Sequence, residues 1–164
     1  MKSKTRLFVF VSLILTLLTG SMCAQEQTAW KKDIPKAVLD AFKKSYPNAS
    51  IQGYSKETEN NTVLYEVEST EGTIHRDITY KSDGSLVTIE ESFPFEELPE
   101  AVRNTIEKKY PKAKIEICEK VTEGSVSRFE LLLTWEKKKL EVVLNPDGTV
   151  VKTEEKQGKE IDEG

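Results

Sequence analysis

Apolar residues recur every three or four positions in two stretches of the chain and alternate with polar residues in most of the rest. The first apolar stripe begins at Ile34 and ends at Tyr46, and the second begins at Leu98 and ends at Tyr110. This spacing predicts two amphipathic helices, each with one face toward a core. A proline stands in the first turn of each stretch, where its missing N–H costs no helical hydrogen bond.

The alternating stretches predict four strands after each helix. After the first helix they fall near residues 49–57, 62–70, 73–81 and 85–91. The Glu71-Gly72 pair suits a two-residue hairpin loop, and an Asp-Gly pair in the last turn of each set suits a type I turn with a glycine bulge. A helix followed by an antiparallel meander predicts an α+β fold, in which each helix packs on a four-stranded antiparallel sheet.

The same order of elements occurs twice. Residues 33–91 and 97–155 align without a gap at an offset of 64, so that DIPKAVLDAFKKSYPNASI stands against ELPEAVRNTIEKKYPKAKI. This self-similarity predicts a tandem duplication, followed by a disordered tail at 156–164. Two units of this size are marginal alone, so we expect Phe93 and Phe95, in the short connection, to pack between them.

The first 24 residues predict a secretory signal. Three basic residues precede an apolar run at 7–18, and Ala24 is the predicted last residue of the signal. The run is short for a stable membrane span, so the sequence predicts a periplasmic or secreted protein. Cys23 raises the alternative of a lipoprotein anchor, which is disfavoured because Met22 precedes it where a small residue is usual.

Charge and composition exclude several function classes. Without the predicted signal the chain holds 21 basic and 28 acidic residues, a net charge of −7, and no basic cluster that would predict a nucleic-acid partner. Cys118 is then the only cysteine and His75 the only histidine, so neither a disulfide nor a His/Cys metal site is predicted. No phosphate loop, dinucleotide fingerprint or nucleophile motif occurs. The sequence therefore predicts a protein that is not an enzyme and has no cofactor.

Four short motifs recur in both units in the same order. They are an [IL]-P-x-A-V helix opening, a Y-P-x-A-x-I helix exit, an aromatic-Glu strand and an Asp-Gly hairpin. In this the chain resembles the PepSY-like family of small secreted Bacteroidetes proteins, described as putative beta-lactamase-inhibitor-like, across nearly all of 33–155 as two tandem repeats. The resemblance implies one helix on a four-stranded antiparallel sheet in each unit. It also implies a binding role in which a sheet face meets an enzyme, and it supplies no catalytic residues.

Strand pairing across the Glu71-Gly72 loop predicts which side chains share the face away from the helix. It places Glu66 opposite Asp77, and the offset of 64 places Glu130 opposite Glu141. Like charges in direct cross-strand contact are unfavourable. The pairs are therefore either recognition points for a basic partner or a cation, or ordinary solvated surface charges.

Apolar residues are expected on the same face. Leu132, Val143 and Val151 predict either a partner surface or a patch covered by packing between the units. The candidate partner-binding residues are therefore Glu66, Asp77, Glu130, Leu132, Glu141, Val143 and Val151.

The leading hypothesis is an exported, non-enzymatic binding module for a protein or peptide in the cell envelope, acting in an inhibitor-like way. The alternative is a periplasmic protein that uses the acidic pairs to bind a small molecule or a cation.

Overall fold

The computed structural model describes residues 27–156. The predicted signal at 1–24 and all of the predicted tail except Lys156 lie outside these residues. The helices are α1 (Lys36–Ser45) and α2 (Glu100–Lys109), and a short 3-10 helix precedes each one, η1 (Lys31–Asp33) and η2 (Phe95–Glu97). The strands are β1 (Gln27–Thr28), β2 (Ser50–Glu59), β3 (Thr62–Glu71), β4 (Ile74–Lys81), β5 (Leu86–Ser92), β6 (Lys114–Glu123), β7 (Val126–Trp135), β8 (Lys138–Leu144) and β9 (Val150–Lys156).

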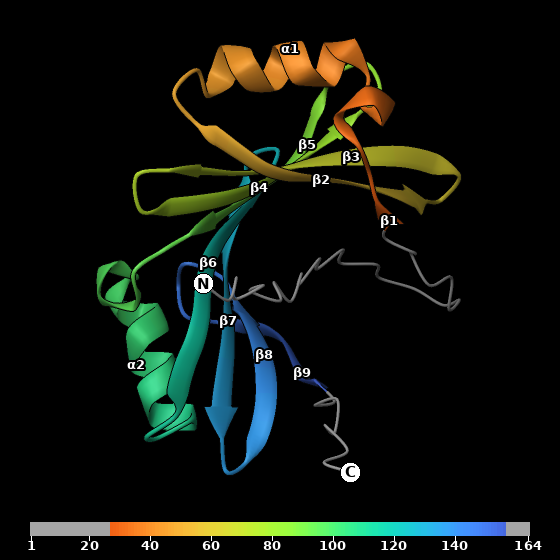
Figure 1. Cartoon of the computed structure of the whole chain (residues 1–164). Coiled ribbons are helices and arrows are strands. Elements are labelled where there is room, and N and C mark those ends of the chain that lie inside the picture. Colours follow the sequence, from red (N-terminus) through yellow and green to blue (C-terminus); the bar gives the residue numbers. More distant parts are fainter. Residues whose placement is uncertain (1–26, 157–164) are drawn as a thin grey trace, which may run out of the picture.

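The strands form one antiparallel sheet of nine strands in sequence order. The predicted α+β class is therefore confirmed, but the expectation of a separate four-stranded sheet in each unit is not met. The reason is that β5 pairs with β6, from Thr88 opposite Glu123 to Ser92 opposite Glu119. This pairing joins the two predicted units edge to edge, and Figure 1 shows the sheet bending where they meet.

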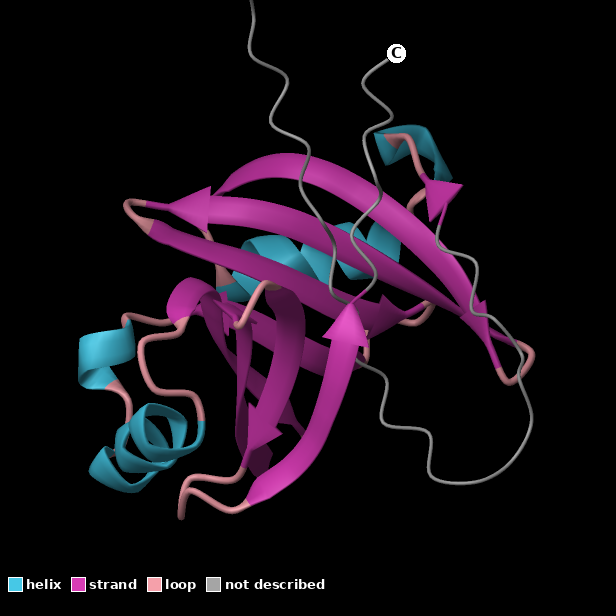
Figure 2. Ribbon diagram, turned by 90° about the horizontal axis from the view of Figure 1, so that it is seen from below, coloured by secondary structure: helices cyan, strands magenta, loops and turns pink. Residues whose placement is uncertain are grey.

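Both helices cover the same face of this sheet. In the first half, Arg76 lies under α1, with its guanidinium carbon 5.1 Å from the centre of the Tyr46 ring. Arg76 is opposite Glu91, and Glu91 is opposite Lys120, which lies beside the α2 core on the same face. Figures 1 and 2 show α1 over β2–β5 and α2 over β6–β9. The other face of the sheet is covered by neither helix.

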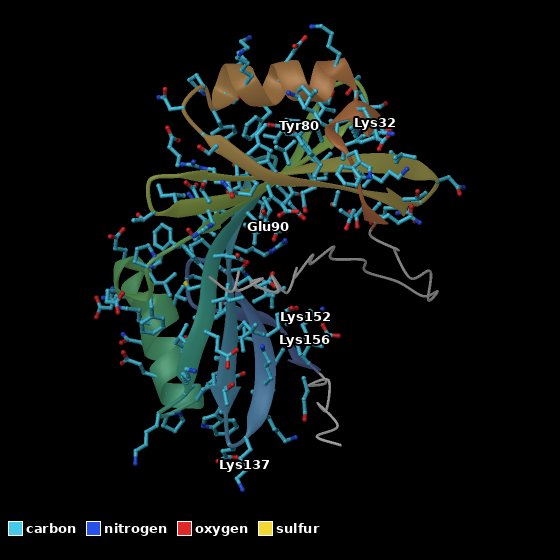
Figure 3. The ribbon with its side chains drawn as sticks, viewed as in Figure 1. Lys32, Tyr80, Glu90, Lys137, Lys152 and Lys156 are labelled. Atoms are coloured by element: carbon cyan, nitrogen blue, oxygen red, sulfur yellow. The ribbon has the colours of Figure 1, made fainter. Side chains whose placement is uncertain are left out.

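The helix-covered face holds two hydrophobic cores. The α1 core contains Ala29, Ile34, Val38, Phe42, Val67, Ile78 and Tyr80. The α2 core contains Leu98, Val102, Ile106, Phe129, Leu131, Leu133, Leu140, Val142 and Leu144. Figure 3 shows Tyr80 between α1 and the sheet. Alternation along each strand therefore sends the apolar side chains to the helices and leaves mostly polar ones on the opposite face.

The two phenylalanines of the connection pack differently from the prediction. Phe93 and Phe95 both lie against the α2 core, and the Phe93 ring is 5.6 Å from the Phe129 ring. They belong to the second half rather than to an interface between two bodies, because the sheet itself makes that junction.

A glycine anchors the last hairpin of each half to its helix. Gly84 and Gly148 have φ angles of +83° and +82°, and a Cβ on either would lie within 2.6 Å of the carbonyl oxygen of Ala37 or Ala101. The Thr105 hydroxyl donates a hydrogen bond to the Gly148 carbonyl at 3.0 Å. Both the left-handed backbone and the close approach require glycine at these turns.

Candidate functional site

The sheet face away from the helices carries carboxylates on strands of both halves. Within the first half, Asp77 of β4 lies between Glu68 of β3 and Glu90 of β5. Within the second half, Glu119 of β6 lies directly opposite Glu130 of β7. We call this surface the acidic face, and its carboxylates include Glu66, Glu68, Asp77, Glu90, Glu119, Glu130 and Glu141.

Burial and mutual repulsion favour the protonated form of three of these groups. Burial raises the pKa of Glu90 to about 10, and the charges of Glu119 and Glu130 add to the shift. Burial, followed by the charges of Glu141 and Glu119, raises the pKa of Glu130 to about 9. Burial, followed by Asp77 and Glu141, raises the pKa of Glu119 to about 7. These carboxyl groups therefore hold protons near neutral pH, where an exposed glutamate is ionised.

Glu130 is the least solvent-exposed of the three. Its residue is 2% exposed, and neither carboxylate oxygen makes a hydrogen bond. Its cross-strand neighbours are Glu119 on one side and Val143 on the other, and neither carries a positive charge. An unsatisfied polar group in such a place costs stability.

Glu141 is compensated by the chain itself. It is fully buried, and its carboxylate lies 2.6 Å from Lys156 Nζ and 3.8 Å from Lys152 Nζ. Both lysines come from the neighbouring strand β9, and both also pair with Glu154. At this end of the acidic face, carboxylates and ammonium groups therefore balance one another.

The predicted register of the candidate residues is wrong by two positions. Glu66 lies opposite Thr79 rather than Asp77, and Glu141 lies opposite Leu132 rather than Glu130. The first loop is the cause: Glu71 pairs with Ile74, so the two loop residues are Gly72 and Thr73. A shift of two keeps every side chain on its predicted face and changes only its partner.

The predicted exposed apolar patch is also corrected. Leu132 and Val143 do lie on the acidic face, but they are 3% and 1% exposed, whereas Val151 is 39% exposed. Val151 lies in an irregularity of the β8–β9 pairing, which interrupts the alternation of side chains there. Leu132 and Val143 therefore line the base of the acidic face, and their role in binding a partner stays a prediction.

Sequence reasoning did not single out Glu90 and Glu119. Each stands in an alternating strand and reads as an ordinary solvent-facing residue. Their proximity depends on the β5–β6 pairing, which no local pattern predicts. The signal that could have found them is a charge count by face, because acidic residues outnumber basic ones on this side of strands β3 to β8.

Within residues 27–156 we find neither an activated cysteine nor a cluster of metal ligands. Burial raises the pKa of the Cys118 thiol to about 12, so it is a poor nucleophile. Across residues 27–156, no group of three or more His, Cys, Asp or Glu side chains is placed to hold a metal ion. Within the same range, no helix is long and apolar enough to cross a membrane.

Comparison with known proteins gives a family match and several similar folds. A family model described as "Putative beta-lactamase-inhibitor-like, PepSY-like" matches residues 24–88 and 63–152, which together are more than half of the chain. No curated protein matches the chain.

Three crystal structures of Bacteroides proteins have a similar fold. A putative periplasmic protein from Bacteroides eggerthii is 16% identical with a TM-score of 0.64, over 74% of this chain and 88% of its own. A BLIP-like protein from Bacteroides fragilis is 18% identical with a TM-score of 0.62, over 77% and 90%. A DUF2874 family protein from Bacteroides uniformis is 17% identical with a TM-score of 0.62, over 74% and 88%. At these identities the likeness concerns the fold alone.

Proposed function

The chain belongs to the PepSY-like family, and from that premise we propose that it is an exported, non-enzymatic binding module. Its partner is a protein or peptide of the cell envelope, and the acidic face is the surface that holds it. The two halves arose by tandem duplication of one helix-and-meander unit. Export accords with the signal-like first 24 residues and with the periplasmic description of the similar Bacteroides eggerthii protein.

One observation carries this proposal. The acidic face concentrates buried carboxylates at positions where apolar or solvated residues would stabilise the fold better. Features that reduce stability without a compensating contact are typical of functional surfaces. The face is also a continuous sheet surface without a helix over it, which suits contact with a second macromolecule.

The family description and the BLIP-like neighbour support an inhibitor-like mode of action, in which a sheet face covers part of an enzyme. A cation-binding role is the alternative, because carboxylates also suit divalent ions. The placement of the side chains within residues 27–156 does not favour it, since none of their acidic groups is arranged to hold a metal.

A steric block tests the proposal independently of charge. Thr79 lies on the acidic face between Glu66 and Thr88, and its replacement by tryptophan suits a strand while filling the face. The matched control is Asn104→Trp on the exposed side of α2. Each protein, without residues 1–24, is immobilised and exposed to an envelope extract of its own organism. We expect wild type and Asn104→Trp to capture the same proteins and Thr79→Trp to lose them. Equal capture by all three, or none by wild type, would contradict the proposal.

A further inference from the structure

Three carboxylates at the bend of the sheet form a cluster that the chain does not neutralise. Glu119 lies opposite Glu130, and Ser92, which lies opposite Glu119, is two residues from Glu90 on the same face of β5. We call Glu90, Glu119 and Glu130 the carboxylate triad. Its members come from the consecutive strands β5, β6 and β7 and so span the junction between the two halves.

Three cations on the acidic face pair with carboxylates outside the carboxylate triad. Arg128, two residues before Glu130 on β7, has Nη1 3.7 Å from Glu123 Oε2, and its buried Nε makes no hydrogen bond. Lys152 and Lys156 pair with Glu141 and Glu154. Figure 3 shows these lysines on β9, well away from Glu90 at the bend. Within residues 27–156, therefore, no ion pair reaches any member of the carboxylate triad.

Glu130 supplies an observation beyond the clustering of charge. It is 2% exposed, it lies at the base of the acidic face, and both of its carboxylate oxygens lack a hydrogen-bond donor. Glu90 and Glu119 are partly exposed, so a ligand group can contact them at the acidic face. Glu130 is a buried hydrogen-bond acceptor without a donor, and Glu90 and Glu119 are more accessible acceptors beside it. This arrangement fits a ligand that carries several hydrogen-bond donors.

The same surface shows how such a carboxylate is paired with a cation. At Glu141, which is equally buried, the Lys156 ammonium from the neighbouring strand lies 2.6 Å away and keeps the pair within the sheet. The carboxylate triad presents the same kind of acceptor without the cation. The missing component is therefore a cationic side chain that reaches the face from outside the described chain.

We propose that the carboxylate triad receives an arginine side chain from a basic, extended segment of a protein partner. This inference rests on the proposed function and names the chemistry of the contact. A guanidinium group offers five N–H donors in a planar fork and is less strongly hydrated than an ammonium. It can therefore bridge carboxylates on neighbouring strands, where a lysine would satisfy a single point.

The protonation state of the carboxylate triad gives this contact a pH signature. The charged groups that face it are Glu66 and Asp77 from β3 and β4, Glu123 from β6, Arg128 from β7, Glu141 from β8 and Lys156 from β9, of which only the arginine and the lysine favour ionisation. The raised pKa values of Glu90, Glu119 and Glu130 mean that guanidinium binding displaces protons. Affinity therefore rises with pH, by about tenfold per pH unit for each proton released.

The test is isothermal titration calorimetry of the mature protein with N-acetyl hexaarginine amide. The matched neutral peptide is hexacitrulline, which has nearly the same shape without the charge. We expect hexaarginine to bind more tightly at pH 9 than at pH 6, with a measurable proton release in buffers of different ionisation enthalpy, and hexacitrulline not to bind. An affinity for hexaarginine that does not change over this pH range would overturn the inference, because exposed carboxylates are ionised throughout it.

Two isosteric variants locate the contact. Glu130→Gln and Glu119→Gln should each weaken hexaarginine binding at pH 9 by about tenfold or more, because each removes a charged partner of a desolvated pair. Glu107→Gln on the exposed side of α2 removes the same charge far from the acidic face and should leave binding unchanged. Equal weakening by all three variants would show general attraction to an acidic protein and overturn the inference.

The outcomes separate this inference from the proposed function. Suppose that Thr79→Trp fails to capture an envelope protein that Glu130→Gln and Glu119→Gln capture as well as wild type does. The proposed binding function would then be supported, and the arginine contact would be overturned. Binding of calcium chloride alone, without binding of hexaarginine, would overturn the arginine contact in favour of a cation site.

Discussion

Glu119 and Glu130 lie directly opposite each other across the β6–β7 pair, and no cation of the described chain is paired with either. Two like charges in this relationship destabilise a sheet. Both carboxyl groups therefore favour the protonated form, and the pKa is raised to about 9 for Glu130 and to about 7 for Glu119. The acidic face therefore contains carboxyl groups that are neutral in the free protein and can ionise when a positive partner arrives.

Replacement of Glu130 by glutamine should stabilise the protein at alkaline pH. The folded state holds the Glu130 proton up to a pKa of about 9, whereas the unfolded chain releases it near the ordinary value of 4.5. The contribution of Glu130 to stability is thus fully present below about pH 4.5 and is lost as pH rises through about 9, at about 1.4 kcal/mol per pH unit. Glutamine does not titrate, so Glu130→Gln should be more stable than wild type at pH 9, by several kcal/mol.

Urea unfolding at pH 5, 7 and 9 measures this difference. Wild type should lose stability between pH 5 and pH 9, and Glu130→Gln should lose less. The control Glu107→Gln, at an exposed helix position, should follow wild type. A Glu130→Gln protein that is less stable than wild type at pH 9 would show that this carboxylate is ionised and compensated in the free protein.

Loss of Lys156 should destabilise the second half of the sheet. Lys156→Met keeps most of the aliphatic stem but leaves the fully buried Glu141 without its partner at 2.6 Å. A buried charge that loses its partner is costly, and because Lys156 is itself partly exposed we expect a decrease of about 1–3 kcal/mol in the free energy of unfolding.

Lys138→Met, on the neighbouring strand β8, is the matched control. Lys138 pairs with Glu155 at 2.7 Å, but both side chains are more than half exposed. An exposed pair contributes about 0–1 kcal/mol. Similar decreases for Lys138→Met and Lys156→Met in urea unfolding would indicate that Glu141 is not stabilised by the β9 lysines.

Gly148→Ala should destabilise the contact between the last hairpin and α2. The φ angle of +82° is unfavourable for alanine, and the new Cβ would lie 2.5 Å from the Ala101 carbonyl oxygen. The left-handed backbone alone costs about 1–2 kcal/mol, and the clash adds to it. Gly124→Ala, with a φ of +58° and no atom within 4 Å of the new Cβ, isolates the backbone contribution. Thermal unfolding should rank Gly148→Ala clearly below Gly124→Ala, and equal losses would mean that the hairpin does not press on the helix.

The continuous sheet predicts a single cooperative unfolding transition. Phe93→Ala removes a ring that packs against Phe129 in the α2 core next to the β5–β6 junction, and it should lower stability by about 1–3 kcal/mol. Because β5 and β6 remain paired, both halves should still unfold together. Circular dichroism and tryptophan fluorescence should then give one midpoint, since circular dichroism reports on the strands of both halves and Trp135, packed against the α2 core, reports on the second. Two separate midpoints in wild type would show that the halves are independent domains.

Periodicity alone predicted most of the secondary structure. The apolar stripes from Ile34 and Leu98 correspond to α1 and α2, and the four strands predicted after the first helix agree with β2 to β5 to within two residues. The side-chain faces of β3 and β4 were also correct, because alternation fixes the face even where the pairing partner is not known.

The cross-strand pairs of residues could not be predicted from the local sequence pattern. Moving the first hairpin loop from Glu71-Gly72 to Gly72-Thr73 shifts every pair by two residues, and both loops place a glycine where a positive φ is needed. The β5–β6 pairing follows from how the two halves meet in space. The relation of Glu90 to Glu119 and Glu130 therefore became visible only in the folded structure.

Direct titration of the carboxyl groups tests the central claim, that the acidic face stores protons at neutral pH. Glutamate side chains labelled with ¹³C at the carboxyl carbon report ionisation by chemical shift, and Glu90→Gln, Glu119→Gln and Glu130→Gln assign the signals. In the free mature protein we expect one signal to titrate near pH 7 and two to titrate near pH 9–10, as the pKa values of Glu119, Glu130 and Glu90 require. Titration of all three signals near pH 4.5 would show that the acidic face is an ordinary solvated surface and would contradict the account.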